Sequence, residues 1–368
     1  MKIGIYTIHS AYNYGAMFQA YATQKALEKL GYDSEFVNLY TKEAEAKNEN
    51  KLNSYQLKPL LISLYSRLNP KVRLKYKRFR EFHSKMILSK RYYSLDEIYK
   101  TPPKYDAHLV GSDQVWNLQQ GFSERAYYFL DFLNNNEIKI SYAASFGTSQ
   151  VNKKYHDQLK TLLTSFKSIA VREDDGVNII KEATGLGATQ VLDPTYLLNA
   201  DEWSDLAPER LIKENYIFCY GFDDSEISSQ LINNTKKRLN LPVIALSIGV
   251  SFPHKVDRFF QEAGPREFIS LIKHASFICT SSYHGLAFAI HFRKSFFTVK
   301  HPQRNSRMET IMNKFNLFDR QISRAEDILE LTEDQLFIDY TTIEEKINFQ
   351  TTQSLKCLKD SVANISGE

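Results

Sequence analysis

Cysteine is scarce in this 368-residue sequence, which contains three. Cys219, Cys279 and Cys357 lie far apart, and none belongs to a Cys-x-x-Cys pair. The sequence therefore predicts neither a disulfide framework nor a zinc site, and it is typical of a reducing compartment. No apolar run approaches the length of a membrane span, and the first residues lack the apolar segment of a signal peptide. We expect a cytoplasmic protein.

Motifs that would assign a reaction directly are also missing. No Gly-x-Gly-x-x-Gly follows a strand, so a dinucleotide cofactor is not indicated, and no Gly-x-Ser-x-Gly elbow is present. No His-Glu-x-x-His, Asp-x-Asp or other grouping has the spacing of metal ligands. The sequence thus predicts no metal and no cofactor, and an activity that chelators leave unchanged.

The composition is that of a folded protein with more than one core. Hydrophobic residues make up 43% and aromatic residues 13% of the chain, which excludes a disordered protein. Because single cores stop growing beyond about 250 to 300 residues, a chain of this length predicts two domains.

The net charge of +4 is unevenly distributed. Residues 51–104 contain 14 Lys and Arg against 3 Asp and Glu, and among them Val72, Tyr76 and Phe79 recur at helical spacing. This predicts a basic helix, whose charged side is either a solvated face or a surface for an anionic partner. We expect peripheral contact with the anionic inner face of a membrane through residues 71–91. No motif for nucleic-acid recognition is present, so no nucleic-acid partner is expected.

Strand and helix patterns alternate along most of the chain. Short apolar runs are followed by longer amphipathic segments, which is typical of parallel sheets covered on both faces. The pattern breaks after residue 197 and begins again near residue 216. Strands are expected at 2–8, 34–39, 107–111, 139–143, 168–171, 189–192, 216–220, 243–247, 277–280 and 295–299.

This organisation predicts two Rossmann-like, doubly wound α/β domains facing a central cleft, similar to the GT-B architecture of glycosyltransferases. We expect an N-terminal domain over residues 1–197, on the acceptor side, with a basic helical insertion at about 51–104. The C-terminal domain, on the donor side, is expected over 198–340. Residues 341–368 are expected to form a helix that packs back on the N-terminal domain. Such an architecture does not by itself identify a reaction.

One strand end carries a histidine. The apolar run at 277–280 leads into Ser281-Ser282-Tyr283-His284-Gly285, after which a helical apolar pattern begins. A histidine in this place lies beside the free N–H groups of a helix N-terminus, at the sheet edge where ligands bind and anions are favoured. Its imidazole titrates near neutrality and can move protons. The alternative is a histidine packed within a βα turn.

Two polar loops follow strands of the first domain. Asn13 and Tyr14 lie between the first strand and a helix, and Asp113, Gln114 and Trp116 follow a later strand. Hydrogen-bonding side chains beside a flat ring are typical of saccharide sites. Ordinary turn chemistry and a loop packed by its own side chains are the alternatives.

Two charged residues also end strands. Arg172 could form a bidentate pair with a carboxylate or phosphate, or else a surface ion pair with Glu173. Asp193 could serve as a base or as a helix cap.

Taken together, these segments resemble the polysaccharide pyruvyl transferase family. The stretches 265–269 and 304–307 also fit, and the resemblance extends to about residue 320. One departure is Tyr283, because some members carry an arginine directly before the histidine. The carboxylate or phosphate contact of that arginine must come from elsewhere or be absent. The motifs that carry the resemblance are residues 13–22, 111–117, 142–147, 171–173, 192–195 and 281–285.

The resemblance implies transfer of a pyruvyl group from phosphoenolpyruvate to two hydroxyls of a sugar. The sugar would belong to a surface or capsular polysaccharide or to its lipid-linked precursor. His284 is expected to act as the general acid/base that protonates C3 of the donor. Donor-binding residues are expected to be Arg172, Ser282, Gly285 and Arg307, and acceptor-binding residues Asn13, Tyr14, Asp113, Gln114 and Trp116.

Two other functions fit the same pattern. A nucleotide-sugar glycosyltransferase of GT-B type would bind a nucleoside diphosphate rather than phosphoenolpyruvate. A non-catalytic saccharide-binding protein would bind sugar without releasing phosphate.

Overall fold

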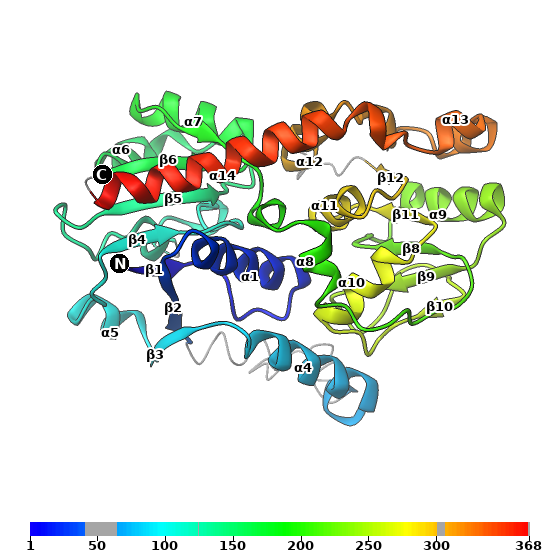
Figure 1. Cartoon of the computed structure of the whole chain (residues 1–368), viewed down its shortest axis with the longest axis horizontal. Coiled ribbons are helices and arrows are strands. Elements are labelled where there is room, and N and C mark those ends of the chain that lie inside the picture. Colours follow the sequence, from blue (N-terminus) through cyan, green and yellow to red (C-terminus); the bar gives the residue numbers. More distant parts are fainter. Residues whose placement is uncertain (41–64, 124, 300–305, 367–368) are drawn as a thin grey trace.

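The N-terminal half of the chain forms a seven-stranded parallel sheet in the order β3-β2-β1-β4-β5-β6-β7. The structure, a computed structural model, describes residues 1–40, 65–123, 125–299 and 306–366. Strands β4 and β5 are buried at every residue, because helices cover both faces of the sheet (Figure 1). The strands are β1 (Lys2–Tyr6), β2 (Asp33–Leu39), β3 (Leu88–Tyr92), β4 (Ala107–Val110), β5 (Lys139–Ala144), β6 (Phe166–Val171) and β7 (Thr189–Gln190).

The helix that follows β1 begins at a side-chain cap. Asn13 accepts a hydrogen bond from Ala16 N at 3.2 Å, which fixes the first turn of α1 at the carboxyl edge of the sheet. The α-helices of this half are α1 (Tyr14–Lys29), α4 (Pro70–His83), α5 (Leu95–Lys100), α6 (His156–Leu163) and α7 (Asp174–Thr184). Short 3₁₀ helices are η1 (Leu118–Gln120), η2 (Ala126–Phe129), η3 (Lys153–Tyr155) and η4 (Pro194–Leu197).

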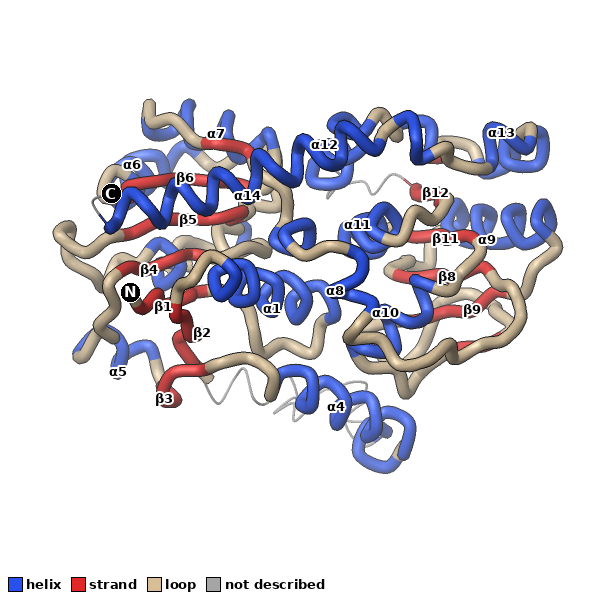
Figure 2. Tube along the Cα trace, viewed as in Figure 1, coloured by secondary structure: helices blue, strands red, loops and turns tan. Residues whose placement is uncertain are grey.

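The C-terminal half forms a second parallel sheet of six strands, in the order β10-β9-β8-β11-β12-β13. The two sheets lie side by side (Figure 2). Two doubly wound α/β units are therefore present, as the sequence predicts. The strands are β8 (Ile217–Tyr220), β9 (Val243–Leu246), β10 (Arg258–Phe259), β11 (Phe277–Thr280), β12 (Phe296–Val299) and β13 (Gln321–Ile322).

Helices connect and cover this second sheet. The α-helices are α8 (Ala200–Ser204), α9 (Glu226–Leu239), α10 (Pro265–Lys273), α11 (Tyr283–His291), α12 (Ser306–Phe315), α13 (Glu333–Leu336) and α14 (Glu344–Ser366), and the 3₁₀ helices are η5 (Phe318–Arg320), η6 (Ala325–Glu330) and η7 (Tyr340–Thr342). None of the helices in the described ranges is both long and apolar enough to cross a bilayer.

The segment expected as a basic helical insertion is only partly helical. Residues 51–64 lie outside the described residues. Residues 70–83 form α4, but residues 88–92 form the edge strand β3. This strand pairs with β2, with Phe36 opposite Leu88 and Leu39 opposite Tyr92. Charged side chains on an edge strand discourage pairing with other chains, so basic composition here does not indicate a helix.

Aromatic side chains pack the two halves together. Phe18 of α1 lies 4.7 Å from Phe288 of α11 and 5.2 Å from Phe268 of α10, between ring centroids. Trp203, in the connector between the sheets, packs edge-on against Phe18 and Phe288. All four side chains are fully buried. This packing brings the N-terminal turn of α1 close to that of α11.

Two helices cross from one half to the other. In Figure 1, α4 lies beneath both α1 and α10, and α14 runs back from the C-terminal sheet along β5 and β6. Ser361 of α14 shares a hydrogen bond with Ser168 of β6 at 2.8 Å, and Ser354 accepts from Leu192 N at 2.9 Å. The last helix therefore packs on the N-terminal sheet.

Candidate functional site

A cavity of about 410 Å³ opens between the two sheets, at the carboxyl ends of their strands. Asn13, Asp113 and Gln114 line it from the N-terminal half. The C-terminal half contributes residues that follow β8, β9 and β11 and residues from the first turn of α12. They include Tyr220, Asp223, Ile248, Ser282, Tyr283, His284 and Arg307.

His284 is held in the first turn of α11 against the other half of the molecule. Ser282 caps the helix by accepting from Gly285 N at 3.5 Å, which places His284 at the helix N-terminus. The imidazole lies so close to Gly15 of α1 that a Cβ atom built on Gly15 would stand 2.0 Å from Nδ1. Its side chain is 10% exposed, and the exposed part lines the cavity.

A buried carboxylate stands behind the imidazole. Asp193 Oδ2 is 3.7 Å from His284 Nε2, a charge contact longer than a hydrogen bond, and 2.7 Å from Arg172 Nη1. Ser112 Oγ donates to the same oxygen at 3.1 Å, and the backbone N–H and hydroxyl of Thr195 donate to Oδ1. Asp193 therefore joins the histidine and the arginine in one network.

The network keeps its charges despite burial. Burial by itself raises the pKa of Asp193, but the neighbouring His284, the Arg172 guanidinium and the Thr195 donors outweigh it and hold that pKa well below its usual range. Burial by itself lowers the pKa of Arg172, but Asp193 and, to a smaller extent, Tyr283, Asp113 and Glu173 together raise it above its usual value. Arg172 and Asp193 thus form a buried ion pair that stays ionised at neutral pH.

Two guanidinium groups face the ring of Tyr283. Their Cζ atoms lie 4.9 Å (Arg172) and 5.9 Å (Arg307) from the ring centroid, within the range of a cation–π contact. Burial and then the Asp193 carboxylate raise the pKa of the Tyr283 phenol, so it stays protonated. Burial and the charge of Arg172 lower the pKa of Arg307 to about 10, which leaves it charged at pH 7.

Several donors of this cluster have no hydrogen-bond partner among the described residues. They are Nε and Nη2 of Arg172 and the hydroxyl of Tyr283, and all three atoms are buried. An unpaired buried donor costs roughly 1–3 kcal/mol, so the cluster holds hydrogen-bonding capacity behind the cavity wall that the described residues leave unused. The Gln114 amide, with its oxygen turned to Arg307, accepts from Nη2 at 2.7 Å and orients that guanidinium at the cavity.

A comparison with protein families decides what kind of protein this geometry belongs to. The model of a family described as polysaccharide pyruvyl transferase matches residues 13–302. This range includes all residues that line the cavity except Arg307 and Met308. The chain belongs to the polysaccharide pyruvyl transferase family. Membership supports a transferase that modifies saccharides.

Solved structures share the architecture of this pyruvyl transferase family member at low sequence identity. Anabaena HepE in complex with UDP aligns at a TM-score of 0.53 with 10% identity over 100% of both chains. UDP-GlcNAc 2-epimerase from Neisseria meningitidis, bound to UDP-GlcNAc, aligns at 0.51 with 11% identity over 99% of this chain and 100% of its own. An α-glucosyltransferase in complex with UDP-glucose and abasic DNA aligns at 0.51 with 11% identity over 99% of each chain. These likenesses show the fold alone. No curated protein matches the chain in sequence.

The cavity brings together most residues expected at the site from the family resemblance. They come from both halves of the molecule and include the histidine, its cap and one of the two arginines. These residues are Asn13, Asp113, Gln114, Ser282, His284 and Arg307. Arg172 lies one layer behind, 1% exposed, against Asp193 and the Tyr283 ring.

Three expected site residues have other roles. Trp116 is fully buried, stacks on Phe129 and donates from Nε1 to Tyr128 O, so it cannot pack on a sugar. Tyr14 is fully buried, and its hydroxyl donates to Ala263 O across the interface. Gly285 packs on Thr280, where a Cβ would stand 2.2 Å from Oγ1, and its N–H is taken by the helix cap.

Sequence reasoning named Asp193 as a base or a helix cap, but it did not predict the contacts of Asp193 with Arg172 and His284. Asp193 lies between β7 and η4, and its Asp-Pro-Thr pattern is typical of a capping residue, which it also is, since it caps η4. Tyr220 is the last residue of β8, and Asp223 and Ile248 follow β8 and β9, so their position at or after the ends of predicted strands was the available signal. In the part of the chain that the structure describes, no group of three or more His, Cys, Asp and Glu could hold a metal ion.

Proposed function

We propose that the chain transfers the pyruvyl group of phosphoenolpyruvate to two hydroxyls of a sugar, forming a cyclic ketal and releasing phosphate. The sugar belongs to a surface or capsular polysaccharide or to its lipid-linked precursor. The observation that carries this proposal is the placement of two guanidinium groups, of Arg172 and Arg307, against the ring of Tyr283 next to His284, at a cavity on the carboxyl edge of both sheets.

The donor is a small dianionic or trianionic molecule with a carboxylate and a phosphate, and this cluster matches it. Arg307 reaches the cavity and offers a fork of N–H donors. The protonated Tyr283 hydroxyl and the first turn of α11 add neutral donors. Arg172 contributes positive charge from behind the ring rather than direct contact. Tyr283 and the two arginines together supply what an arginine directly before His284 supplies in some family members.

The chemistry requires one group that gives and takes a proton, and His284 fits that role. A proton from the His284 imidazolium adds to C3 of the enol phosphate while the first sugar hydroxyl oxygen bonds to C2, and the hydroxyl proton returns to the imidazole. The second hydroxyl oxygen then bonds to C2 as the bond from C2 to the phosphate oxygen breaks, and its proton leaves with phosphate. Asp193 stabilises the imidazolium form that donates the proton to C3 and that is restored when the hydroxyl proton returns. No step needs a metal or a cofactor.

The acceptor is proposed to lie on the N-terminal side of the cavity, against Asn13, Asp113 and Gln114.

We also propose peripheral contact with an anionic membrane through residues 71–91, but not through every basic residue of this segment. Lys75 is 2% exposed and donates to the carbonyls of Ser247, Ile248 and Gly249, so its charge does not face a membrane.

A nucleotide-sugar glycosyltransferase is the second candidate. It is favoured by the solved structures of the same fold that contain UDP or a UDP-sugar. Tyr220 and Asp223 would then face a nucleoside on the C-terminal side.

The two candidates are separated by turnover with a defined donor. The full chain is incubated with phosphoenolpyruvate and a panel of free and lipid-linked saccharides, and phosphate release and ketal formation are followed, the latter by mass spectrometry. We expect ketal formation that falls by about 100- to 10,000-fold in His284→Gln, as for loss of a positioned acid/base, and persists in His156→Gln, a half-buried histidine on α6. Transfer from a UDP-sugar with no use of phosphoenolpyruvate would support the second candidate instead.

A further inference from the structure

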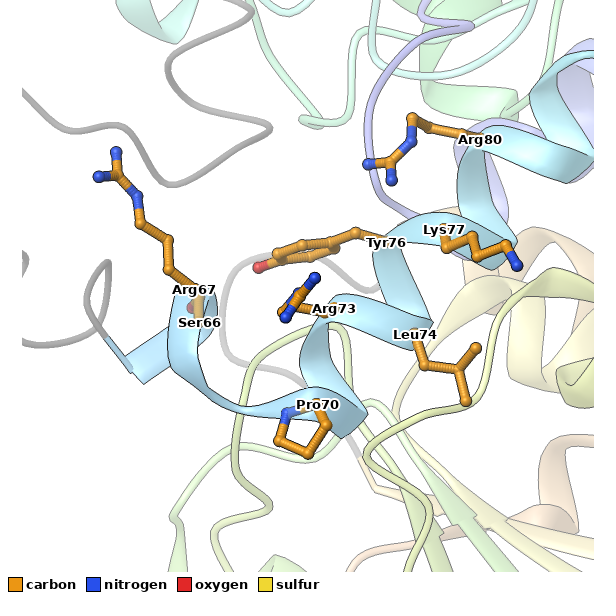
Figure 3. A pocket seen from close by; sticks show the side chains of 8 residues that line it. All are labelled: Ser66, Arg67, Pro70, Arg73, Leu74, Tyr76, Lys77 and Arg80. Carbon is orange, nitrogen blue, oxygen red and sulfur yellow. The ribbon is translucent and has the colours of Figure 1, made fainter.

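A second hollow, of about 520 Å³, lies on the outer side of α4. It is lined by Arg67, Arg73, Tyr76, Lys77 and Arg80, together with Leu74. Figure 3 shows the guanidinium groups of Arg73 and Arg80 on the same side of α4 as the ring of Tyr76, with Arg67 extending from the preceding helical turn. The hollow is therefore cationic and has an aromatic wall.

The opposite side of α4 makes the contacts that hold this helix on the rest of the molecule. Val72, Phe79 and Phe82 are buried there, and Lys75 bonds to three carbonyls of the C-terminal half. Arg78 donates to Glu262 O. The basic side chains that line the hollow take part in none of these contacts.

Among the described residues, carboxylates that face the cations of the hollow are few. Among ion pairs within the described ranges, Lys77 faces Glu81 at 3.7 Å, and both side chains are more than half exposed. No such pair involves Arg67, Arg73 or Arg80 in the described part of the chain. Like charges gathered around a concave surface repel one another and attract an anion, and arginine forks match phosphate oxygens.

Apolar side chains stand exposed beside these cations. Leu68 is 70%, Tyr65 is 45% and Leu74 is 38% exposed. Exposed apolar residues next to basic ones are typical of segments that lie at a membrane interface, where arginines bind headgroup phosphates and apolar groups enter the acyl boundary. A phosphate free in solution would give the apolar residues no partner. The combination therefore favours a lipid.

The hollow adjoins the acceptor side of the main cavity. Tyr76 stacks on Tyr12 with ring centroids 5.0 Å apart, and Arg80 Nη1 lies 3.4 Å from the Tyr12 hydroxyl. The next residue, Asn13, lines the main cavity. A lipid held by α4 would thus lie one side chain from the place proposed for the acceptor.

We propose that Arg67, Arg73 and Arg80 form a site for the phosphate headgroups of anionic membrane lipids, with Leu68 and Leu74 entering the bilayer surface. The site deepens the membrane contact suggested above. It holds the protein at the surface that carries a lipid-linked acceptor, and its lipid binding does not depend on pyruvyl chemistry.

The test is sedimentation of the full chain with vesicles of phosphatidylglycerol and phosphatidylcholine, at low and at physiological salt. We expect binding that decreases with salt, and a vesicle affinity about 10- to 100-fold lower in the triple variant Arg67→Ser, Arg73→Ser, Arg80→Ser. The control removes the same charge elsewhere, from the exposed residues Lys160, Lys167 and Lys181, each changed to Ser, and should retain binding.

Three results would overturn the proposal. They are no sedimentation of the parent chain at low salt, equal losses in both triple variants, or binding of inorganic pyrophosphate to the hollow without binding of vesicles. A circular dichroism melt of each variant confirms that it is folded. Because no donor is present, failure of this test leaves the proposed reaction untouched, and failure of the reaction leaves this site untouched.

Discussion

The imidazole of His284 in α11 packs directly against the backbone of Gly15 in α1, so that residues from the two halves of the molecule meet at the proposed reaction centre. No side chain at position 15 would fit, since a Cβ there would stand 2.0 Å from Nδ1, 2.4 Å from Cε1 and 2.6 Å from Cγ of the ring. The Asp193 carboxylate contacts the same ring from behind. The position of the imidazole is thus set jointly by α1, by the end of the first domain and by α11.

Gly15→Ala should lower kcat through displacement of this ring. In an ordinary helix the change would be mildly stabilising, by about 1 kcal/mol, but here the methyl group occupies the place of the imidazole. We expect a loss of tenfold or more in turnover, since small misplacements of a catalytic group are costly. The matched control is Gly187→Ala, because a Cβ at Gly187 meets nothing within 4 Å. Steady-state kinetics of both variants check this, and equal activities would show that the ring need not lie where it does.

Arg307→Gln should weaken donor binding with little effect on folding. Arg307 lines the cavity, and its guanidinium is oriented by Gln114, whereas Arg172 is an element of the buried ion pair. We expect the KM for phosphoenolpyruvate to rise by at least tenfold, with an unchanged KM for the acceptor and an unchanged Tm. A variant with normal donor KM would remove Arg307 from the donor site.

Asp193→Asn should remove an acid-sensitive part of the stability. The pKa of Asp193 is held well below its usual range in the folded chain, so an unfolded chain binds a proton first as the pH falls through about 4. The carboxylate therefore stabilises the fold above that pH, and the contribution is lost below it. At pH 7 the variant leaves Arg172 buried without its charge partner, at a cost of about 3–5 kcal/mol. Denaturant unfolding from pH 3 to 7 should show a difference between the two proteins that shrinks towards low pH, and a constant difference would contradict the ion pair.

Lys75→Met should show a pH dependence of the same sign in a higher pH window. Burial lowers the pKa of Lys75 to about 7, so between pH 7 and about 10.4 the unfolded chain holds a proton that the folded chain has released. Folding of the wild-type chain is therefore favoured as the pH rises through this window, and the variant lacks this effect. We expect the unfolding free energy of the wild type to gain on that of the variant from pH 7 to 10. Lys85→Met, at an exposed position, serves as control and should show no such trend.

The strands and the two-sheet fold could be predicted because the signals are local. Runs such as residues 107–110 and 277–280 are buried on both faces of a parallel sheet, which requires continuous apolar sequence. The edge strand β3 could not be recognised in the same way. Its sequence is Leu-Ser-Lys-Arg-Tyr, and pairing with β2 rather than apolar burial defines it.

The location of the site could be predicted from the sequence, but the hydrogen bonds and ion pairs between its residues could not. Polar residues after strands gather at one edge, which brings Asn13, Gln114 and His284 together. Trp116 shows the limit of this reasoning, because its indole turns inward to stack on Phe129. The contact of Arg172 with Asp193 depends on how the ends of two strands lie next to each other in space. No local sequence pattern indicates that arrangement.

The most direct test of the account is which donor the folded chain binds. Binding to the native state raises the Tm, so thermal shift with phosphoenolpyruvate, UDP and GDP compares the candidates on one protein. We expect phosphoenolpyruvate to raise the Tm of the wild type and not that of Arg307→Gln, while UDP and GDP have no effect. A shift with UDP or GDP, and none with phosphoenolpyruvate, would contradict it.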